Sequence, residues 1–319
     1  MHMSTLESLG KDIPRITASE LIRETIFTNS KIIIVEGQTD KSTYSYWLRR
    51  QAIANQQIDV ENIHFVQAEW VSELNSEEEG FQFSKRMRDT YVNDSKARCR
   101  GKVVAAARVA SELGQNNVCG IVDQDLGVGD LPPNVFYTDY PALESYALHP
   151  EVLDDLNERF FKEELPPGNE IVPQMAAILA QLFIIRRLNP GMNYERLRIA
   201  QGFEDEKSTS SSGVQKIRNF SLLLAVGEDD WEVPDDDSVV SAGQDYRYYA
   251  YGHDVAKVLF YGFSDIFNKL KFRLDHVEAL LRDRLRDWHG VEEEPLYLKI
   301  EAFALNGVQY NCTPNTPGD

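Results

Sequence analysis

Residues 31–40 read KIIIVEGQTD, and this stretch decides the fold class. Its four consecutive apolar residues are all β-branched and stop at a glutamate and a glycine, which is typical of a buried parallel strand. A Thr-Asp pair follows, and Tyr44, Trp47 and Leu48 then recur at helical spacing. We therefore expect a buried strand at KIIIV and a helix from about Thr39.

Strand and helix signals alternate through the next hundred residues. Strand candidates are IHFVQA (63–68), NVCGIVDQD (117–125) and NVFYTD (134–139), and GKVVAAARVASELG (101–114) predicts a helix between the second and the third strand. A short helix is expected in PALESYAL (141–148). Alternating strands and helices predict a parallel sheet with right-handed crossovers, so the expected fold class is α/β.

Beyond Pro150 the sequence predicts a mainly helical unit. IVPQMAAILAQLFIIRRL (171–188) is expected to be a core helix, and DVAKVLFYGFSDIFNKLKF (254–272) and LDHVEALLRDRLRDWHG (274–290) are expected to be two more. The tail YLKIEAFALNGVQYN (297–311) is assigned one or two strands. The predicted domains are a leader with a short helix (1–30), a sheet domain (31–150) and a mainly helical domain (151–319), part of which could pack back on the sheet domain.

Acidic residues fall where the predicted strands end. Glu36 closes the first strand, Asp123 and Asp125 close the third as D-x-D, and Asp40 lies four residues after Glu36. Glu144 stands just after the fourth strand. Ligands of open parallel sheets bind beyond the carboxyl ends of the strands, so these side chains are expected to converge there. Strand alternation would also point both members of D-x-D the same way.

Carboxylates gathered without His or Cys predict a site for Mg²⁺ or Mn²⁺ rather than for zinc. Such ions polarise a phosphoryl oxygen and generate hydroxide from bound water. A lone D-x-D at a strand end is often only turn or cap chemistry. The order strand–EGxxD, then helix–strand–DxDxG, favours the metal site.

The segments IIIVEGQTD and GIVDQDLG resemble the two signature motifs of TOPRIM domains, and residues 31–148 cover essentially that whole domain. The resemblance implies a Rossmann-like sheet with flanking helices and metal ligands at Glu36, Asp123 and Asp125. OLD-family nucleases carry further acids that match Asp40, where they often have Glu, and Glu144. The implied activity is hydrolysis of phosphodiester bonds by a magnesium-dependent endonuclease, with Glu36 also available as general base.

A narrower resemblance involves VEGQTDKSTYSYW, TDYPALESYAL and GHDVAKVL. These segments are similar to stand-alone TOPRIM effectors of anti-phage defence, of which the AriB nuclease of PARIS systems is the best-known kind. The resemblance implies cleavage of nucleic acid, tRNA included, under the control of an ABC-type ATPase. The chain contains no G-x-x-x-x-G-K-[ST] motif, so that ATPase is expected on a separate chain.

One basic segment stands out in an acidic chain. KRMRDTYVNDSKARCRGK (85–102) holds seven Lys and Arg residues against two Asp. It predicts phosphate contacts through Arg98, Arg100, Gly101 and Lys102, with base stacking by Tyr91. The alternative is a solvated helix face. His253, with nearby Lys257, is a further catalytic candidate as a cation near the scissile phosphate, the alternative being an exposed residue at a helix start.

Composition sets the remaining limits. The formal net charge is −18, which opposes non-specific coating of DNA but permits a local basic patch or a basic protein partner. No stretch approaches the roughly 18 apolar residues of a membrane span, and the N-terminus lacks an apolar signal region, so no membrane association is expected. Three cysteines without CxxC spacing predict neither disulfides nor zinc. We expect a reducing cytoplasm.

Two rival functions stay open on sequence grounds. One is a non-catalytic partner-binding module with a structural Mg²⁺ site. The other is strand transfer or primer synthesis. Primases need a zinc-binding module, and the sequence has no cysteine cluster. Topoisomerases need a nucleophilic tyrosine on another domain, and the chain has too many tyrosines to single one out. RNA or DNA as substrate, the identity of the partner and the oligomeric state, including a homodimer, are likewise open.

Overall fold

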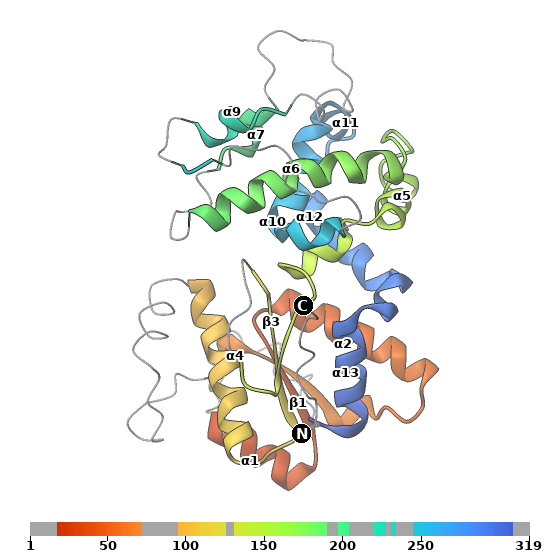
Figure 1. Ribbon diagram of the computed structural model, residues 1–319. Helices are drawn as coiled ribbons and strands as arrows, with labels where there is room; N and C mark the ends of the chain where they lie inside the picture. Colours follow the sequence, from red (N-terminus) through yellow and green to blue (C-terminus); the bar gives the residue numbers. More distant parts are fainter. Residues whose placement is uncertain are drawn as a thin grey trace, which may run out of the picture. The chain divides into compact units, whose positions relative to one another are not determined.

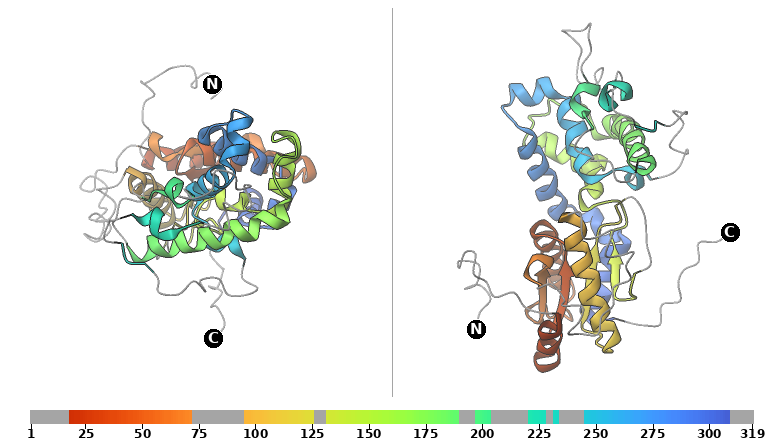
Figure 2. Two further views of the ribbon diagram at one scale, coloured as in Figure 1. Left: turned by 90° about the horizontal axis from the view of Figure 1, so that it is seen from above. Right: turned by 90° about the vertical axis from the view of Figure 1, so that its left-hand side faces the viewer.

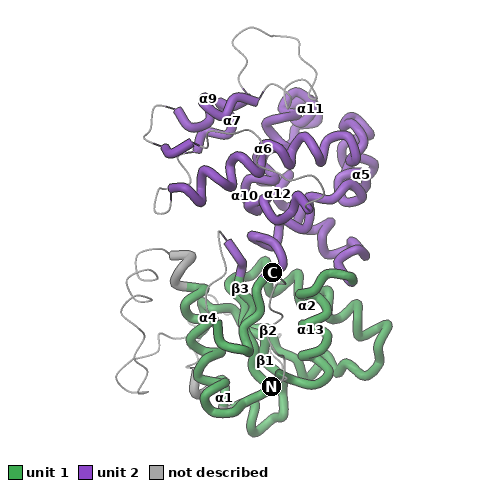
Figure 3. Tube along the Cα trace, viewed as in Figure 1, with its two compact units in different colours: residues 1–122, 129–137, 293–319 green, residues 123–128, 138–292 purple. Residues whose placement is uncertain are grey.

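The computed structural model describes residues 18–71, 95–125, 131–189, 197–203, 220–227, 231–233 and 245–308. The chain forms two compact units (Figure 3). Unit 1 comprises residues 1–122, 129–137 and 293–319, and unit 2 comprises residues 123–128 and 138–292. These divisions lie elsewhere than the sequence-based boundaries after residues 30 and 150, because the C-terminal segment belongs to unit 1 and residues 138–150 belong to unit 2.

Unit 1 contains a four-stranded parallel sheet in the order β2-β1-β3-β4. The strands are β1 (Lys31–Val35), β2 (Ile63–Gln67), β3 (Val118–Val122) and β4 (Val135–Tyr137). Each lies inside a segment that the sequence assigns to a strand, and the α/β fold class is confirmed. Ile33 of β1 pairs with Phe65 on one side and with Cys119 on the other, so β1 is an interior strand.

Helices cover both faces of this sheet (Figures 1 and 2). On one face lie α1 (Ala18–Thr28) and α4 (Ser95–Glu112), and on the other lie α2 (Gln38–Ala54) and α13 (Pro295–Asn306). Short 3-10 helices flank β2, namely η2 (Val60–Asn62) and η3 (Ala68–Trp70). The sheet is therefore the middle of three layers, which explains why its strands read as continuous apolar runs.

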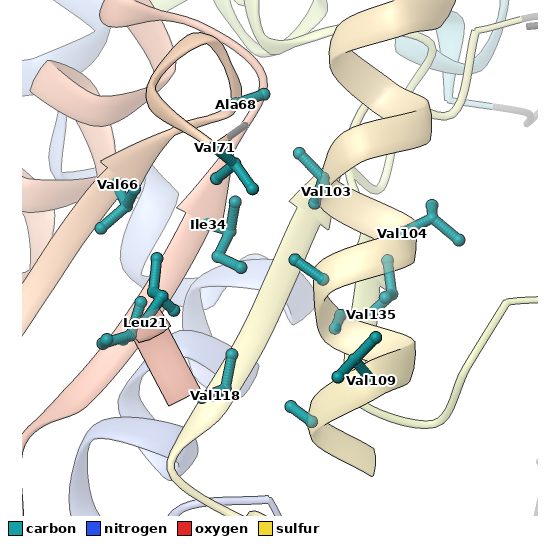
Figure 4. Close-up of a cluster of buried hydrophobic side chains, with 14 of the residues drawn as sticks. Leu21, Ile34, Val66, Ala68, Val71, Val103, Val104, Val109, Val118 and Val135 are labelled. Atoms are coloured by element: carbon teal, nitrogen blue, oxygen red, sulfur yellow. The ribbon is translucent and has the colours of Figure 1, made fainter. Parts of the chain in front are cut away.

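Alternating side chains of β1 fill both interfaces. Ile32 and Ile34 belong to a core cluster with Val103 and Val118 between the sheet and α4 (Figure 4). Because successive strand side chains point to opposite faces, the fully buried Ile33 faces the other layer. In that layer the rings of Trp47 and Tyr297 lie 5.8 Å apart, joining α2 to α13.

The expectation of strands in the tail is wrong for its described part, because residues 295–306 form the helix α13, and residues 309–311 lie outside the described residues. Pro295 occupies the first turn, where a missing N–H costs nothing. Tyr297, Ile300 and Phe303 are buried at intervals of three, which is a helical spacing. Gly307 ends the helix with φ 72°, a conformation that favours glycine. Two aromatic residues among aliphatic ones made a helical face resemble a strand.

Unit 2 is helical. It contains η4 (Leu143–Ala147), α5 (Pro150–Arg159), α6 (Gly168–Leu188), α7 (Ile199–Gly202), α9 (Leu222–Val226), η6 (Tyr246–Tyr249), α10 (Gly252–Gly262), α11 (Ser264–Lys269) and α12 (Leu274–Asp287). The 3-10 helix η7 (His289–Glu293) follows, and its last residue, Glu293, is the first residue of the C-terminal segment of unit 1. The single helix expected over 254–272 is divided at Phe263, a buried residue between α10 and α11. The helix expected in PALESYAL is the 3-10 helix η4.

The apolar helix α6 corrects one sequence expectation. Its 21 residues include an 18-residue window of mean hydropathy 1.4, which is long and apolar enough to cross a membrane. However, 61% of that window is buried inside the structure, and the helix carries Arg186, which is itself buried. Burial of this kind is typical of a core helix, as the sequence predicted for 171–188, and length and composition alone are weak support for a membrane span.

Candidate metal centre

The first two acidic candidates lie where β1 passes into α2. Glu36 is the first residue after β1, and Asp40 is the third residue of α2. The Asp40 carboxylate accepts a hydrogen bond from the Gly37 backbone N–H at 2.9 Å, which holds it at the helix N-terminus. Asp40 therefore has a local structural role in addition to any role as a ligand.

The strand order reverses at β1. β2 lies on one side of β1 and β3 on the other, so the direction in which strands are added reverses between β1 and β3. Val35 pairs with Ile121, and these two strands run parallel. Their carboxyl ends therefore share one edge, and the residues that follow them are Glu36 and, after Val122, Asp123.

The D-x-D segment forms a turn and is not part of β3. β3 ends at Val122, and the backbone N–H of Gln124 donates to the Thr138 hydroxyl at 2.8 Å. The N–H of Asp125 donates to the Pro141 carbonyl at 2.7 Å, and Asp125 has φ 51°. The expectation that strand alternation aligns the two carboxylates is therefore wrong, because these hydrogen bonds turn the chain within two residues of the strand.

Both D-x-D carboxylates nevertheless act on one neighbour, Tyr251. Burial raises the pKa of the Tyr251 hydroxyl, and the negative charges of Asp125 and Asp123 raise it further, while Arg186 opposes them. The Arg186 guanidinium lies over the Tyr251 ring, 4.8 Å from its centroid. It also forms two hydrogen bonds with Asp254, at 2.9 and 2.7 Å, and this ion pair is almost fully buried. Neither Tyr251 nor Arg186 was recognised from the sequence, since their separation along the chain gives no signal.

Glu144 lies in η4 and is held by an arginine. Its carboxylate accepts a hydrogen bond from Arg282 of α12 at 2.7 Å, and the pair is largely buried. Gly252, at the start of α10, packs directly against it. A Cβ at Gly252 would lie 2.6 Å from a Glu144 carboxylate oxygen and 2.8 Å from the Ala142 side chain. A metal ion would therefore compete with Arg282 for Glu144.

A further acidic residue in unit 1 was missed. Glu69 lies in η3, two residues after β2 ends, and its side chain is exposed. The half-buried thiol of Cys99 reports the local charge. Burial raises the pKa of this thiol, and the negative charges of Glu69, Glu36 and Asp40 raise it further. The rule that points to acids at the carboxyl ends of strands would have found Glu69 had it been applied to the second strand.

The described residues do not form a ready-made metal site. Among them, no three His, Cys, Asp or Glu side chains surround a point that could hold an ion. Glu36 and Asp40 belong to unit 1, whereas Asp123 and Asp125 belong to unit 2. The donor chemistry, carboxylate oxygens alone, does fit Mg²⁺ or Mn²⁺. Carboxylates act on Cys99 in unit 1 and on Tyr251 in unit 2, although burial is the larger cause of the raised pKa of both groups.

The basic segment is only partly described. Tyr91 lies outside the described residues, as do the lysine and the arginines at positions 85, 86 and 88 and the side chain of Arg98. Arg100, Gly101 and Lys102 lie in α4, which begins at Ser95, so Gly101 and Lys102 are not at the helix start as expected.

The two basic side chains of this segment with described surroundings, Arg100 and Lys102, have different neighbours in unit 1. Arg100 lies 5.4 Å from the ring centroid of Tyr137 and donates a hydrogen bond to its hydroxyl at 3.3 Å. The positive charge of Lys102 lowers the pKa of the Cys99 thiol, against the larger opposing effect of burial. Lys102 thus lies in the same part of unit 1 as Glu36 and Asp40, whose charges act on the same thiol.

The G-H-D segment has structural explanations for two of its members. Gly252 permits the close approach to Glu144, and Asp254 forms the buried pair with Arg186. His253 is half-buried at the start of α10, with its ring 6.0 Å from that of Tyr251. Lys257 lies one turn later and is also half-buried.

Comparison of the chain with protein-family models and with curated proteins found no match in either case.

Proposed function

We propose that this chain is a magnesium-dependent endonuclease of the TOPRIM type, which hydrolyses phosphodiester bonds in nucleic acid, with tRNA among its candidate substrates. Its active site would form from Glu36, Asp40, Asp123 and Asp125. The rival in which these residues bind Mg²⁺ only for structure, within a partner-binding module, predicts the same ligands but no cleavage.

The observation that carries this proposal is that each motif directly follows one of two neighbouring parallel strands, β1 and β3. In open parallel sheets, ligands bind beyond the carboxyl ends of the strands at the point where the strand order reverses. Here that point lies between β1 and β3. The chain places Glu36 after β1 and D-x-D after β3, so the acids occupy the ends of the two strands that the rule selects.

A bound Mg²⁺ would polarise a phosphoryl oxygen and lower the pKa of a coordinated water. The carboxylates of Glu36, Asp123 and Asp125 would hold the ion, with Asp40 as a further donor. Glu36 would also be available to accept a proton from the attacking water.

Basic residues and a separate ATPase complete the proposed function. Arg100 and Lys102 would contact substrate phosphates near the acidic residues, and His253 is the candidate cation in unit 2. A nuclease without restraint endangers its own cell, so we propose control by a separate ABC-type ATPase in an anti-phage defence system. A cytoplasmic location is part of the same proposal.

The test is incubation of the purified protein with single-stranded RNA, tRNA and DNA, each with Mg²⁺, with Mn²⁺ and with EDTA. We expect metal-dependent cleavage of at least one substrate, abolished in Glu36→Gln and in Asp123→Asn with folding intact by circular dichroism. Full activity in the doubly substituted protein would refute the assignment. Metal binding without cleavage of any substrate, with and without a co-purified ATPase, would favour the structural module.

A further inference from the structure

An aromatic cluster in unit 2 surrounds the buried ring of Tyr140. The ring of Tyr146 meets it edge-on at 4.7 Å and that of Tyr248 at 5.2 Å. The guanidinium of Arg247 lies over the same ring, 4.4 Å from its centroid. Tyr140 is only 3% exposed, whereas Tyr248 is 47% exposed, so Tyr248 is the solvent-exposed member of this aromatic cluster.

This cluster adjoins the D-x-D turn through the segment 138–141. Thr138 accepts the hydrogen bond from the Gln124 N–H, and Pro141 accepts the one from Asp125. Tyr140 lies between these two residues, and the Thr138 hydroxyl also donates to the Tyr140 carbonyl at 2.6 Å. One short segment thus fixes the Gln124–Asp125 backbone through the Thr138 hydroxyl and the Pro141 carbonyl, and it supports Tyr248 through the Tyr140 ring.

The 3-10 helix that carries Tyr248 is held firmly on its inner side. Asp245 accepts hydrogen bonds from the Arg247 backbone N–H and from its guanidinium, and another from the Tyr140 hydroxyl at 3.2 Å. Hydrogen bonds from Arg247 lower the pKa of Asp245 although burial alone would raise it, so this ion pair persists at neutral pH. A partly exposed ring on such a support loses little conformational freedom when a ligand stacks on it.

We propose that Tyr248 is a stacking site for a base of a single-stranded nucleic acid whose phosphate lies at the D-x-D turn. This inference rests on the proposed nuclease function and adds a substrate class to it, namely strands with accessible bases. Aromatic stacking tolerates any base, because every base has a π-face. Because Asp245 already neutralises Arg247, this site should contribute stacking rather than salt-dependent phosphate binding.

Tyr246 provides a matched control on the same helix. It is 39% exposed, close to the value for Tyr248. In a 3-10 helix, residues three apart point the same way, so Tyr246 shares the direction of Tyr249. The Tyr249 ring packs 6.0 Å from that of Phe183 in α6, and not against Tyr140. Tyr246 is thus an exposed tyrosine on another side of the same helix.

The experiment measures binding of a labelled single-stranded oligonucleotide by fluorescence anisotropy, with the Asp123→Asn protein as parent so that the strand is not cut. A second oligonucleotide of equal length carries abasic sites and keeps every phosphate. We expect the parent to prefer the base-bearing strand. Tyr248→Ala should weaken binding of that strand about 5-fold or more, corresponding to about 1 kcal/mol or more per stacked base. It should leave abasic binding unchanged.

Two more variants separate stacking from other effects. Tyr248→Phe should bind as the parent, whereas Tyr248→Leu, which still covers Tyr140, should behave like Tyr248→Ala. Equal losses for both strands, a parent without preference for bases, or an equal loss in Tyr246→Ala would overturn the proposal. In those cases metal-dependent cleavage by the unsubstituted protein would still stand. Absence of binding to every oligonucleotide, together with absence of cleavage, would instead refute the nuclease function as well.

Discussion

Asp125 adopts a left-handed backbone conformation, with φ 51°, directly beside the strand end where the sequence pattern predicted a regular D-x-D. Asp tolerates this conformation better than most residues, which is one reason for an aspartate there. The sequence thus identified the acidic residues, but not their geometry. The hydrogen bonds that set the geometry are accepted by Thr138 and Pro141, and no local pattern signals those partners.

Gly252 is the other residue whose role required the structure. In the G-H-D segment the sequence favours the histidine as the functional residue, whereas the structure shows close packing at Gly252 and a buried ion pair at Asp254. The contact between Gly252 and Glu144 joins residues more than a hundred positions apart, and the spacing of residues along the sequence does not predict such contacts.

Gly252→Ala is expected to destabilise the protein by about 1–3 kcal/mol, because the added methyl would overlap the rigid Ala142 side chain and displace Glu144. Urea unfolding measures this loss. Gly37→Ala is the matched control, since its nearest neighbouring atom would be 3.6 Å away, an ordinary contact. A cost at Gly252 no larger than at Gly37 would show that the close packing in unit 2 is not present in solution.

At the scale of elements, apolar periodicity was sufficient for most of the fold. The four strands and the core helix α6 lie where runs and spacings of apolar residues predicted them. Two of the exceptions are α13, whose aromatic residues resemble a strand pattern, and the division of the 254–272 helix at Phe263. The local sequence does not separate helix from strand in the tail, or one helix from two over residues 254–272, and packing against other elements decides both.

The buried Arg186–Asp254 pair joins α6 to α10. Arg186→Met alone should cost about 3–5 kcal/mol of unfolding free energy, because it leaves the Asp254 carboxylate buried without its partner. The double variant Arg186→Met/Asp254→Leu should recover most of that loss. A double-mutant cycle by urea unfolding gives the coupling, and strictly additive costs would contradict a direct interaction.

At the scale of the whole molecule, a net charge of −18 must be reconciled with a phosphate-bearing substrate. Charge-neutral variants at Arg98, Arg100 and Lys102 should weaken substrate binding. They should also make the salt dependence shallower by about 0.7–0.9 log units per log unit of salt for each substrate phosphate that the protein no longer neutralises. Lys299→Gln is the control, because this exposed lysine lies on α13, on the opposite face of the same sheet. Unchanged binding in the triple variant at every salt concentration would remove the basic segment from the substrate path.

The central claim is that the residues after β1 and β3 bind one divalent ion, and calorimetric titration with Mn²⁺ tests it most directly. Glu36→Gln and Asp123→Asn should each weaken Mn²⁺ binding by at least about 10-fold, since even loss of an outer-shell partner typically costs that much. Asp59→Asn should leave Mn²⁺ binding unchanged, because Asp59 is exposed and precedes β2, at the amino ends of the strands rather than at their carboxyl ends. Undiminished Mn²⁺ affinity in either Glu36→Gln or Asp123→Asn would contradict a shared metal site.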